Sequence, residues 1–379
     1  MKIAILGTRG IPNHYGGFEQ ITEQLSIGLV EKGHEVFVYN SHKHPYKRST
    51  WKGVHIIHCY DAEHRLKTVG QFVYDFNCIM DARRRGFDVI LFMGYTSSSI
   101  WHPFFPKQST IISNMDGLEW KRTKYSKPVQ TFLKYAERLA IKHSHFHIAD
   151  SVGIQDYLTR KYKIHPQYIS YGASLYQEEK ENILQELGLT RHDYYLLMAR
   201  MEPENNIEMI LQGFAETNSN KKFVVIGNMA NSYGKQLIKK FRGDQRIYFV
   251  GALFDQNAVH TIRKSALLYF HGHSVGGTNP SLLEAMASKA LIAAHDNPFN
   301  KAILEKDALY FTSAEDVKKL IEASLPETIK QRMIGSNYEK ILLQHNWETI
   351  VHQYETFICN CFEKLSNEKV IYNRRYAFK

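Results

Sequence analysis

The sequence has few cysteines and no long apolar run, and each absence excludes a class of protein. Its 379 residues include only four cysteines, whose spacing fits neither a disulfide framework nor a metal site. No stretch approaches the roughly 20 apolar residues that a membrane-spanning helix needs. The first apolar run, Ile3 to Leu6, is too short for a signal peptide. We therefore expect a protein of the reducing cytoplasm, with any membrane contact peripheral.

Positive charge is in surplus, which indicates an anionic partner. The formal net charge is +10, and a nucleic acid, an acidic membrane surface or a phosphorylated substrate would each fit. No nucleic-acid-binding motif is present and the basic residues are spread along the chain, so we expect no nucleic-acid partner. A hydrophobic content of 44% over this length is enough for two globular domains.

Apolar runs alternate with helical patterns through the first part of the chain, which predicts an α/β domain with a parallel sheet. We place this Rossmann-like domain at residues 1–175. The expected helices are 17–32, 69–84 and 128–142, and the expected strands are 1–6, 35–39, 54–58, 89–93 and 110–113. The glycine-punctuated loop after the first strand lacks the G-x-G-x-x-G spacing, and Asn40 and Ser41 stand where a nicotinamide site has an acidic residue. We therefore expect no nicotinamide site there.

The segment NMDGLEWKRTKYSK follows the strand at 110–113 and combines carboxylates with a basic cluster. Asp116 falls at the carboxyl end of the strand, where sites in such sheets lie, and is a candidate acid or base. The basic residues can hold an anionic group. A solvated loop with Trp120 as an anchor is the alternative. The amphipathic helix at 128–142 can rest on a lipid surface or pack its apolar side into the core.

Three histidines, His143, His145 and His147, alternate along an expected strand and would then point to one face. A metal site is conceivable there. No acidic or cysteine partner stands at ligand spacing, so the structural interpretation is favoured.

The second half repeats the βα alternation. We expect strands at 194–199, 223–226, 247–250, 267–270 and 291–294, in a second Rossmann-like domain at residues 190–345. The polar segment before it suits a linker or a surface helix. The last helical pattern, 346–379, is expected to pack back on the first domain.

The segment HGHSVGGTNPSLLEAMASK reads as strand end, loop and helix. Gly276 and Gly277 let the backbone approach a ligand closely, and a helix opening at Pro280 and Ser281 would offer its N-terminus to a phosphate. Glu284, one turn in, can accept bonds from sugar hydroxyls. An ordinary βα connection would show the same spacing.

Four motifs in order, RGIPNHYGGFE, DGLEWKR, ARMEPENNIE and SVGGTNPSLLEAMA, resemble the family 4 retaining glycosyltransferases of the GT-B fold. The likeness is closest to the rhamnosyltransferase-type branch, which extends lipid-linked bacterial cell-surface polysaccharides. The resemblance implies two Rossmann-like domains with parallel sheets facing across a cleft. It also implies a nucleotide-sugar donor in the second domain and an acceptor against the first.

The resemblance assigns roles to particular residues. Arg200 matches the arginine that binds the donor diphosphate, whereas Asn205 stands where the family has a lysine. Glu284 matches the second of two glutamates, which holds the nucleotide ribose, and Gly276 stands at the first. The full expected donor set is Gly16, Gly17, Asn205, His273, Gly276, Gly277, Thr278, Asn279, Ser281 and Glu284.

Sugar transfer of this type implies catalytic roles for Asp116, Arg200 and Glu204. No DxD motif is present, so we expect a metal-independent reaction with no cofactor besides the donor. Acceptor contacts are expected at Glu119, Trp120, Lys121 and Arg122. The expected acceptor is a glycan or a polyprenyl-diphosphate-linked sugar, at the anionic inner face of the plasma membrane.

Three other classes stay open. A sugar-nucleotide epimerase can share the architecture, and would not need an acceptor to release nucleoside diphosphate. A non-catalytic nucleotide-sugar-binding protein of the GT-B fold would bind donor without turnover. A dehydrogenase is the weakest alternative and would require binding of a nicotinamide cofactor.

Overall fold

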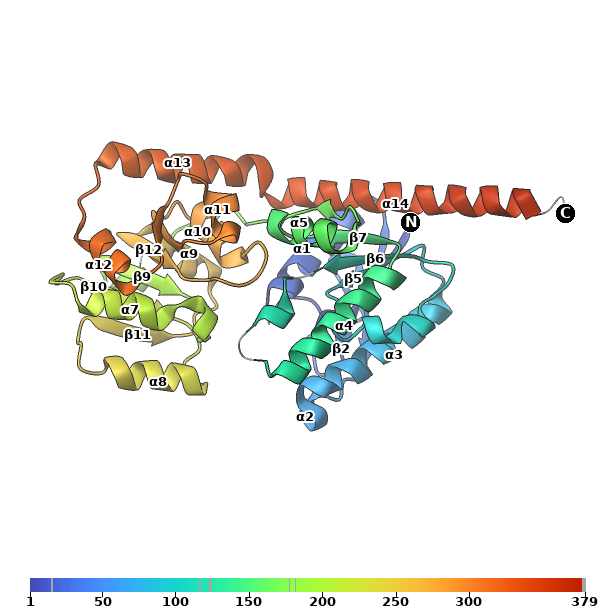
Figure 1. Cartoon of the computed structure of the whole chain (residues 1–379), viewed down its shortest axis with the longest axis horizontal. Helices are drawn as coiled ribbons and strands as arrows, with labels where there is room; N and C mark the ends of the chain where they lie inside the picture. Colours follow the sequence, from blue (N-terminus) through green and yellow to red (C-terminus); the bar gives the residue numbers. More distant parts are fainter. Residues whose placement is uncertain (15, 116, 123–124, 177, 181, 377–379) are drawn as a thin grey trace. The chain divides into compact units, whose positions relative to one another are not determined.

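The computed structural model describes residues 1–379 except 15, 116, 123–124, 177, 181 and 377–379, and leaves the side chains of 368–376 undescribed. The chain forms two compact units (Figure 1). The first comprises Met1–Ser170 and Trp347–Lys379, and the second comprises Tyr171–Asn346.

An eight-stranded sheet in the order β3-β4-β2-β1-β5-β6-β7-β8 forms the core of the first unit. Its strands are parallel except for β3, which runs antiparallel to β4. The strands are β1 (Lys2–Leu6), β2 (Glu35–Ser41), β3 (Thr50–Trp51), β4 (Val54–Cys59), β5 (Val89–Met93), β6 (Thr110–Met115), β7 (Phe146–Ala149) and β8 (Gln167–Tyr168). Every residue of β5, VILFM, is buried, as expected for a central strand covered on both faces.

Helices connect these strands. They are α1 (Gly17–Glu31), α2 (Glu63–Leu66), α3 (Gly70–Arg85), α4 (Lys127–His143), α5 (Val152–Tyr162) and α14 (Trp347–Tyr376), with the short 3₁₀ helices η1 (Lys67–Val69), η2 (Ser99–Phe104) and η3 (Glu119–Lys121). Aromatic side chains join α3 to η2, where Phe76 packs on Trp101 with 4.6 Å between ring centroids.

The C-terminal helix α14 packs on the first unit, as the sequence predicts. A Cβ atom at Gly28 of α1 would lie 2.5 Å from Val351 Cγ1, so only glycine lets the two helices approach this closely. Asn114 at the end of β6 donates a buried hydrogen bond of 2.8 Å to the Tyr354 hydroxyl. The helix is therefore part of the core of this unit, and Figure 1 shows it running along the domain.

The second unit has a six-stranded parallel sheet in the order β11-β10-β9-β12-β13-β14. The strands are β9 (Tyr194–Met198), β10 (Lys222–Ile226), β11 (Ile247–Gly251), β12 (Leu268–His271), β13 (Ile292–His295) and β14 (Leu309–Phe311). The helices are α6 (Asn182–Glu186), η4 (Pro203–Asn205), α7 (Ile207–Ala215), α8 (Ser232–Phe241), α9 (Gln256–Lys264), α10 (Pro280–Ala287), α11 (Pro298–Leu304), α12 (Ala314–Glu322) and α13 (Glu327–Gln344).

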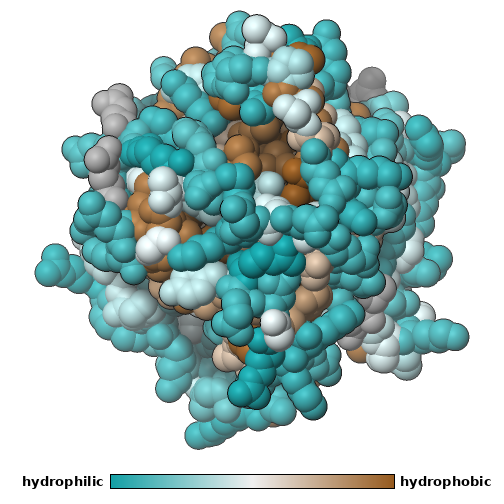
Figure 2. Space-filling view, turned by 90° about the vertical axis from the view of Figure 1, so that its left-hand side faces the viewer, coloured by the Kyte–Doolittle hydropathy of each residue, from teal (hydrophilic) through white to brown (hydrophobic). Residues whose placement is uncertain are grey.

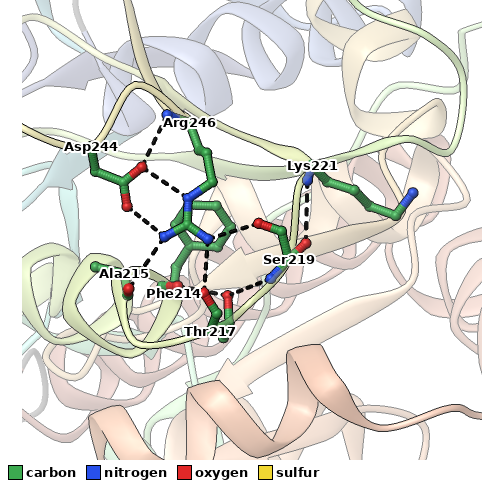
Figure 3. A network of polar contacts seen from close by, with 7 residues as sticks. All are labelled: Phe214, Ala215, Thr217, Ser219, Lys221, Asp244 and Arg246. Carbon is green, nitrogen blue, oxygen red and sulfur yellow. Dashed lines mark hydrogen bonds and ion pairs between the residues drawn. The ribbon is translucent and has the colours of Figure 1, made fainter.

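Arg246 lies just before β11, at the edge of the second sheet where β10 and β11 start (Figure 3). Its guanidinium makes a bidentate pair with Asp244, donates to the carbonyls of Thr217 (2.8 Å), Ser219 (2.7 Å) and Ala215 (3.2 Å), and lies over the Phe214 ring. One side chain thus donates to three carbonyls at and after the end of α7, and ties them to the start of β11.

The face of the molecule shown in Figure 2 is mainly polar. Figure 2 shows the face at the left of Figure 1, where hydrophilic side chains predominate and apolar groups appear in recessed places. This pattern is typical of a surface that contacts water. Within the described chain, no helix combines the length and apolar character needed to cross a membrane.

Apart from the strand expected to carry the three histidines, every strand predicted from the sequence is present, with ends shifted by at most two residues. The histidine strand is a correction, because His143 is the last residue of α4 and only His147 lies on β7. His143 stacks on His102, His145 accepts a hydrogen bond from the amide of Ile111, and His147 is buried beside the Ala140 carbonyl. The three rings therefore do not share a face.

Candidate active site

The order of strands in the second sheet reverses between β9 and β12. From β9 the chain winds outward through β10 and β11, and from β12 it winds the other way through β13 and β14. Open α/β sheets bind their ligands beyond the carboxyl ends of the strands at such a reversal. Segments 199–206 and 272–279 leave β9 and β12 at this position, and both contain predicted site residues.

The loop after β9 is braced by its own side chains. Asn205 is buried and donates a 2.7 Å hydrogen bond from Nδ2 to the Arg200 carbonyl. The side chain of Arg200 is exposed and Glu204 is buried. Asn205 therefore supports the backbone beneath Arg200, and the guanidinium remains accessible to a ligand.

The loops after β9 and β12 are joined to each other. Asn206 donates from Nδ2 to the Gly272 carbonyl (2.8 Å), and Ser274 donates from its amide (3.1 Å) and hydroxyl (2.8 Å) to the Glu204 carbonyl. A Cβ atom at Gly272 would lie 2.1 Å from the Asn205 carbonyl oxygen, so the contact requires glycine. These bonds fix the loop carrying Arg200 against the loop that enters α10.

Helix α10 begins where the sequence predicts. Asn279 is its N-cap and accepts a 2.9 Å bond from the Ser281 amide, and Thr278 just before it is buried. Gly276 has φ +129°, a conformation that side chains disfavour, and a Cβ atom there would meet nothing within 4 Å. A side chain at this position would have space, but the backbone conformation favours glycine. A glutamate at position 276 would thus strain this loop, which gives a physical reason for the departure from the family pattern.

Glu284 is held by a buried arginine that sequence reasoning missed. Arg263, at the end of α9, contacts it with 2.8 Å between Nη1 and Oε2, and only 6% of the arginine side chain is exposed. Burial opposes the charge of Arg263, but the nearby Glu284 carboxylate outweighs it, and the pKa of the guanidinium is raised. Arg263 also reaches Ser281 Oγ at 3.4 Å. The carboxylate is thereby fixed beside the first turn of α10.

One histidine, His271, ends β12, and a second, His273, follows in the loop. The rings of His271 and His273 stack with 4.4 Å between centroids. Burial, followed by the charges of His273 and Arg263, lowers the pKa of His271 well below its ordinary value, so that ring is neutral near pH 7. The His273 carbonyl accepts hydrogen bonds from Asn297 and Asn300 at the start of α11, both 3.0 Å. The α11 N-terminus thus fixes the backbone of the loop at His273.

In the first unit, the loop after β1 also lies at a reversal of strand order, between β1 and β5. Gly16 is the N-cap of α1 and Gly17 its first residue, and both are half-buried. Arg9 donates its amide to Glu19 (2.9 Å) and pairs with Glu63 at 2.8 Å. Arg9 and Glu63 therefore lie at this predicted ligand-binding edge of the sheet. The sequence motifs did not indicate either residue.

Trp120 is fixed by a buried carboxylate. Its Nε1 donates to Glu137 Oε2 at 3.1 Å, and Glu137 also accepts from Tyr157, Tyr162 and Lys161. The ammonium groups of Lys134, Lys121 and Lys161 lie 4.6, 5.6 and 5.6 Å from the centroid of a Trp120 ring. This geometry favours the interpretation in which Trp120 anchors the loop. The same geometry places three lysine ammonium groups around the Trp120 ring.

The remaining predicted residues divide between the units. Glu119 and Arg122 form a 2.7 Å ion pair next to Trp120 and Lys121. Asp116 lies outside the described residues. Arg200, Glu204, Asn205, His273, Gly276 to Asn279, Ser281 and Glu284 belong to the two joined loops and α10 of the second unit. Gly16, Gly17 and residues 119–122 belong to the first unit.

Missed residues in the second unit are Arg263, His271, Asn297 and Asn300. Arg263, Asn297 and Asn300 each support a predicted residue from another segment, whereas His271 stacks on its near neighbour His273. Only the proximity of His271 to the GGTNPS motif could have pointed to one of them.

Two families match parts of the chain. Residues 104–174 match a domain of unknown function (DUF1972), and residues 179–341 match Glycosyl transferases group 1. The second match includes every strand of the second sheet and both joined loops. The candidate donor site therefore lies in the part of the chain that matches Glycosyl transferases group 1.

Several known proteins are similar to the chain. Glycosyltransferase 1 domain-containing protein 1 from Xenopus tropicalis is 25% identical over 213 residues, which are 53% of this chain and 61% of the frog protein. Sucrose-phosphate synthase from Thermosynechococcus elongatus superimposes with a TM-score of 0.80 at 17% identity, over 96% of this chain and 99% of that one. HepE from Anabaena, solved with UDP and glucose, gives a TM-score of 0.73 at 17% identity, over 95% and 99%.

The structural likenesses show that the chain has the GT-B fold of two parallel-sheet α/β domains, as predicted. The group 1 domain and the frog relative support a glycosyltransferase.

Proposed function

We propose that the chain is a glycosyltransferase that moves a sugar from a nucleoside-diphosphate donor to an acceptor hydroxyl, with retention of the anomeric configuration. One observation carries the proposal. The joined loops at the β9–β12 reversal hold the exposed Arg200 and the start of α10 at the position where open sheets bind ligands, within a glycosyl transferase group 1 domain.

The donor diphosphate is bound by Arg200 and by the N-terminal end of α10. Negative charge develops on the leaving diphosphate as the glycosidic bond loosens, and preorganised cations and amides lower that barrier. Arg200 is accessible and its loop is braced by Asn205 and Ser274, so little reorganisation is needed. In this proposal Glu204 contacts the donor from the same loop.

Glu284 binds the ribose hydroxyls of the nucleotide. Its carboxylate can accept several hydrogen bonds, and the ion pair with Arg263 fixes its direction. The open space at Gly276 lets the donor sugar approach the backbone, where the amides of Gly276, Gly277 and Thr278 replace the carboxylate of the family pattern. UDP-sugars are the first donors to test because HepE was solved with UDP, and rhamnose or another hexose is the proposed sugar.

The acceptor is a glycan or a polyprenyl-diphosphate-linked sugar of cell-surface polysaccharide synthesis. Asp116 orients or deprotonates its hydroxyl, and residues 119–122 contact it. The cations around Trp120 support peripheral contact with the anionic cytoplasmic face of the plasma membrane. The reaction proceeds without a metal ion.

The test is a panel of nucleotide sugars incubated with a lipid-linked monosaccharide acceptor, with and without a chelator. Product mass identifies the transferred sugar, and NMR of the new linkage reports its configuration. We expect one donor to be incorporated with retention and unaffected by chelator. Release of nucleoside diphosphate only when acceptor is present distinguishes transfer from epimerisation, and tight donor binding without product would support a binding protein instead.

Arg200→Ala should lower kcat/KM by at least about 100-fold, the cost of removing one preorganised charge-stabilising group. Arg242→Ala is the matched control, because Arg242 is an exposed arginine at the C-cap of α8, away from the reversal. Near wild-type kcat/KM in the Arg200 variant would contradict the donor assignment.

A further inference from the structure

A second cluster of functional side chains lies in the first unit, where α14 meets the turn between α1 and β2. It consists of His34, Glu355 and Cys359, one ligand atom of each lying within 4.8 Å of the others. His34 stands just after the Gly33 turn, and Glu355 and Cys359 are one helical turn apart on the same face of α14. The proposed sugar transfer uses none of these residues.

Distances between the candidate ligand atoms approach those of a tetrahedral zinc site. His34 Nε2 lies 3.6 Å from Glu355 Oε1, and Cys359 Sγ lies 4.0 Å from the same oxygen. Zinc bonds of about 2.0 to 2.3 Å at tetrahedral angles separate neighbouring ligand atoms by about 3.4 to 3.6 Å. Small side-chain rotations would bring the three ligand atoms to these separations.

The environment also fits a cation. The His34 side chain is 10% exposed, and within the described part of the chain its Nε2 makes no hydrogen bond, although it contacts Glu355 at 3.6 Å. A buried nitrogen without a hydrogen bond is costly, and a metal ion would satisfy it. Glu355 is 23% exposed, so an ion can enter from solvent.

Two further groups, Lys32 and His352, face the carboxylate. Lys32 Nζ lies 3.8 Å and His352 Nδ1 lies 3.7 Å from Glu355 Oε2. Lys32 follows the end of α1 and His352 lies on α14, and both side chains reach solvent, so they can turn away when a divalent ion binds.

We propose that His34, Glu355 and Cys359 bind one Zn²⁺, with water at the fourth position, and that this ion fastens α14 to the α1–β2 turn. Imidazole, carboxylate and thiolate together favour zinc over the harder ions Mg²⁺ and Ca²⁺, which prefer oxygen ligands alone. Binding displaces the thiol proton of Cys359 to solvent and leaves the thiolate on the metal.

The test uses the full chain, purified on a tag without histidine and stripped with a chelator. Cobalt is titrated as a probe, because a cobalt–thiolate bond gives a charge-transfer absorption, and zinc per chain is measured by mass spectrometry after equilibration. Cys361→Ala is the matched control for Cys359→Ala, since Cys361 lies on the same helix but is buried in the core. Circular dichroism verifies that each variant is folded.

We expect one zinc per chain and a charge-transfer band in the wild type and in Cys361→Ala, with the band absent in Cys359→Ala. Loss of a residue that supports a metal ligand lowers metal affinity about tenfold to 100-fold, and loss of a ligand itself should lower it at least as much. We therefore expect His34→Gln and Glu355→Gln to bind zinc at least about tenfold more weakly. Zinc should raise the unfolding temperature of the wild type and not of Cys359→Ala. A wild type without bound metal, or a band that survives in Cys359→Ala, would overturn the proposal and leave an ion pair only.

Discussion

Asp75 is a buried carboxyl group whose ionisation opposes folding. It lies on α3, is 3% exposed, and accepts a 2.5 Å hydrogen bond from the Ser97 hydroxyl. Burial raises the pKa of Asp75 from 3.8 to about 7, against the lowering effect of the Ser97 hydrogen bond. Because the folded pKa is above the unfolded one, stability is full below about pH 4 and is lost as the pH rises towards 7.

Asp75→Asn should therefore stabilise the first unit at alkaline pH. The shift corresponds to about 4 kcal/mol, and because asparagine keeps an acceptor for Ser97, we expect a gain of about 2 to 4 kcal/mol near pH 8 and little or none near pH 4. Urea unfolding at about pH 8 and about pH 4 measures this gain in the free energy of unfolding. Asp156→Asn, at an exposed position on α5, is the control and should leave the profile unchanged. An equal effect of Asp75→Asn at both pH values would show that ionisation is not its cause.

At this scale the sequence reveals residues in motifs but not their partners. Arg200, Gly276 and Glu284 could be selected because motif spacing places them on loops after strands. Arg263 could not, because its contact with Glu284 exists only once α9 and α10 have packed. The cluster at Glu355 was missed for the same reason, since His34 lies more than 300 residues away in sequence.

Among the elements, the segment joining α8 to β11 depends on Arg246. Arg246→Lys keeps the charge but loses the planar fork that serves Asp244 and three carbonyls at once. We expect the free energy of unfolding of the second unit to fall by about 1 to 3 kcal/mol, measured by urea denaturation. Donor binding should not change, because the network lies at the opposite edge of the sheet from the β9–β12 loops.

Arg242→Lys controls for this prediction, because it makes the same exchange at an exposed position nearby. Equal stability of the two variants would mean that the carbonyl contacts contribute nothing measurable.

Elements with long apolar runs could be located from sequence, whereas short ones could not. All five residues of β5 and of β9 are buried, and a continuous apolar run of this length predicts a central strand. Strands β3 and β8 have two residues each and carry no periodic signal, since pairing with a neighbour defines them. The histidine strand was misplaced because α4 continues to His143, so that of the three alternating histidines only His147 lies on β7.

For the whole molecule, α14 is essential to the first unit and dispensable for the second. Its buried residues include Ile350, Val351, Tyr354 and Ile358. Burial of one such side chain contributes about 1.5 to 3 kcal/mol, so together they approach the stability of an entire domain. A chain ending at Asn346 should lose the folded first unit and retain the second.

Limited proteolysis followed by mass spectrometry would measure this loss. We expect rapid cleavage within residues 1–170 and a protected fragment close to 171–346 that still binds nucleotide. A chain ending at residue 367, which keeps these contacts, is the control. Equal protection of both units in the chain ending at Asn346 would refute the assignment of α14 to the first core.

The return of α14 to the first unit also has a consequence for biosynthesis. The polypeptide leaves that unit at Ser170 and re-enters it at Trp347, so the unit is completed only after residues 171–346 have been synthesised. During translation of the intervening residues, the positions on α1 and β6 that contact Val351 and Tyr354 have no partner. Until α14 emerges, the surface of the first unit that this helix covers stays exposed, which makes that unit a natural client for chaperones.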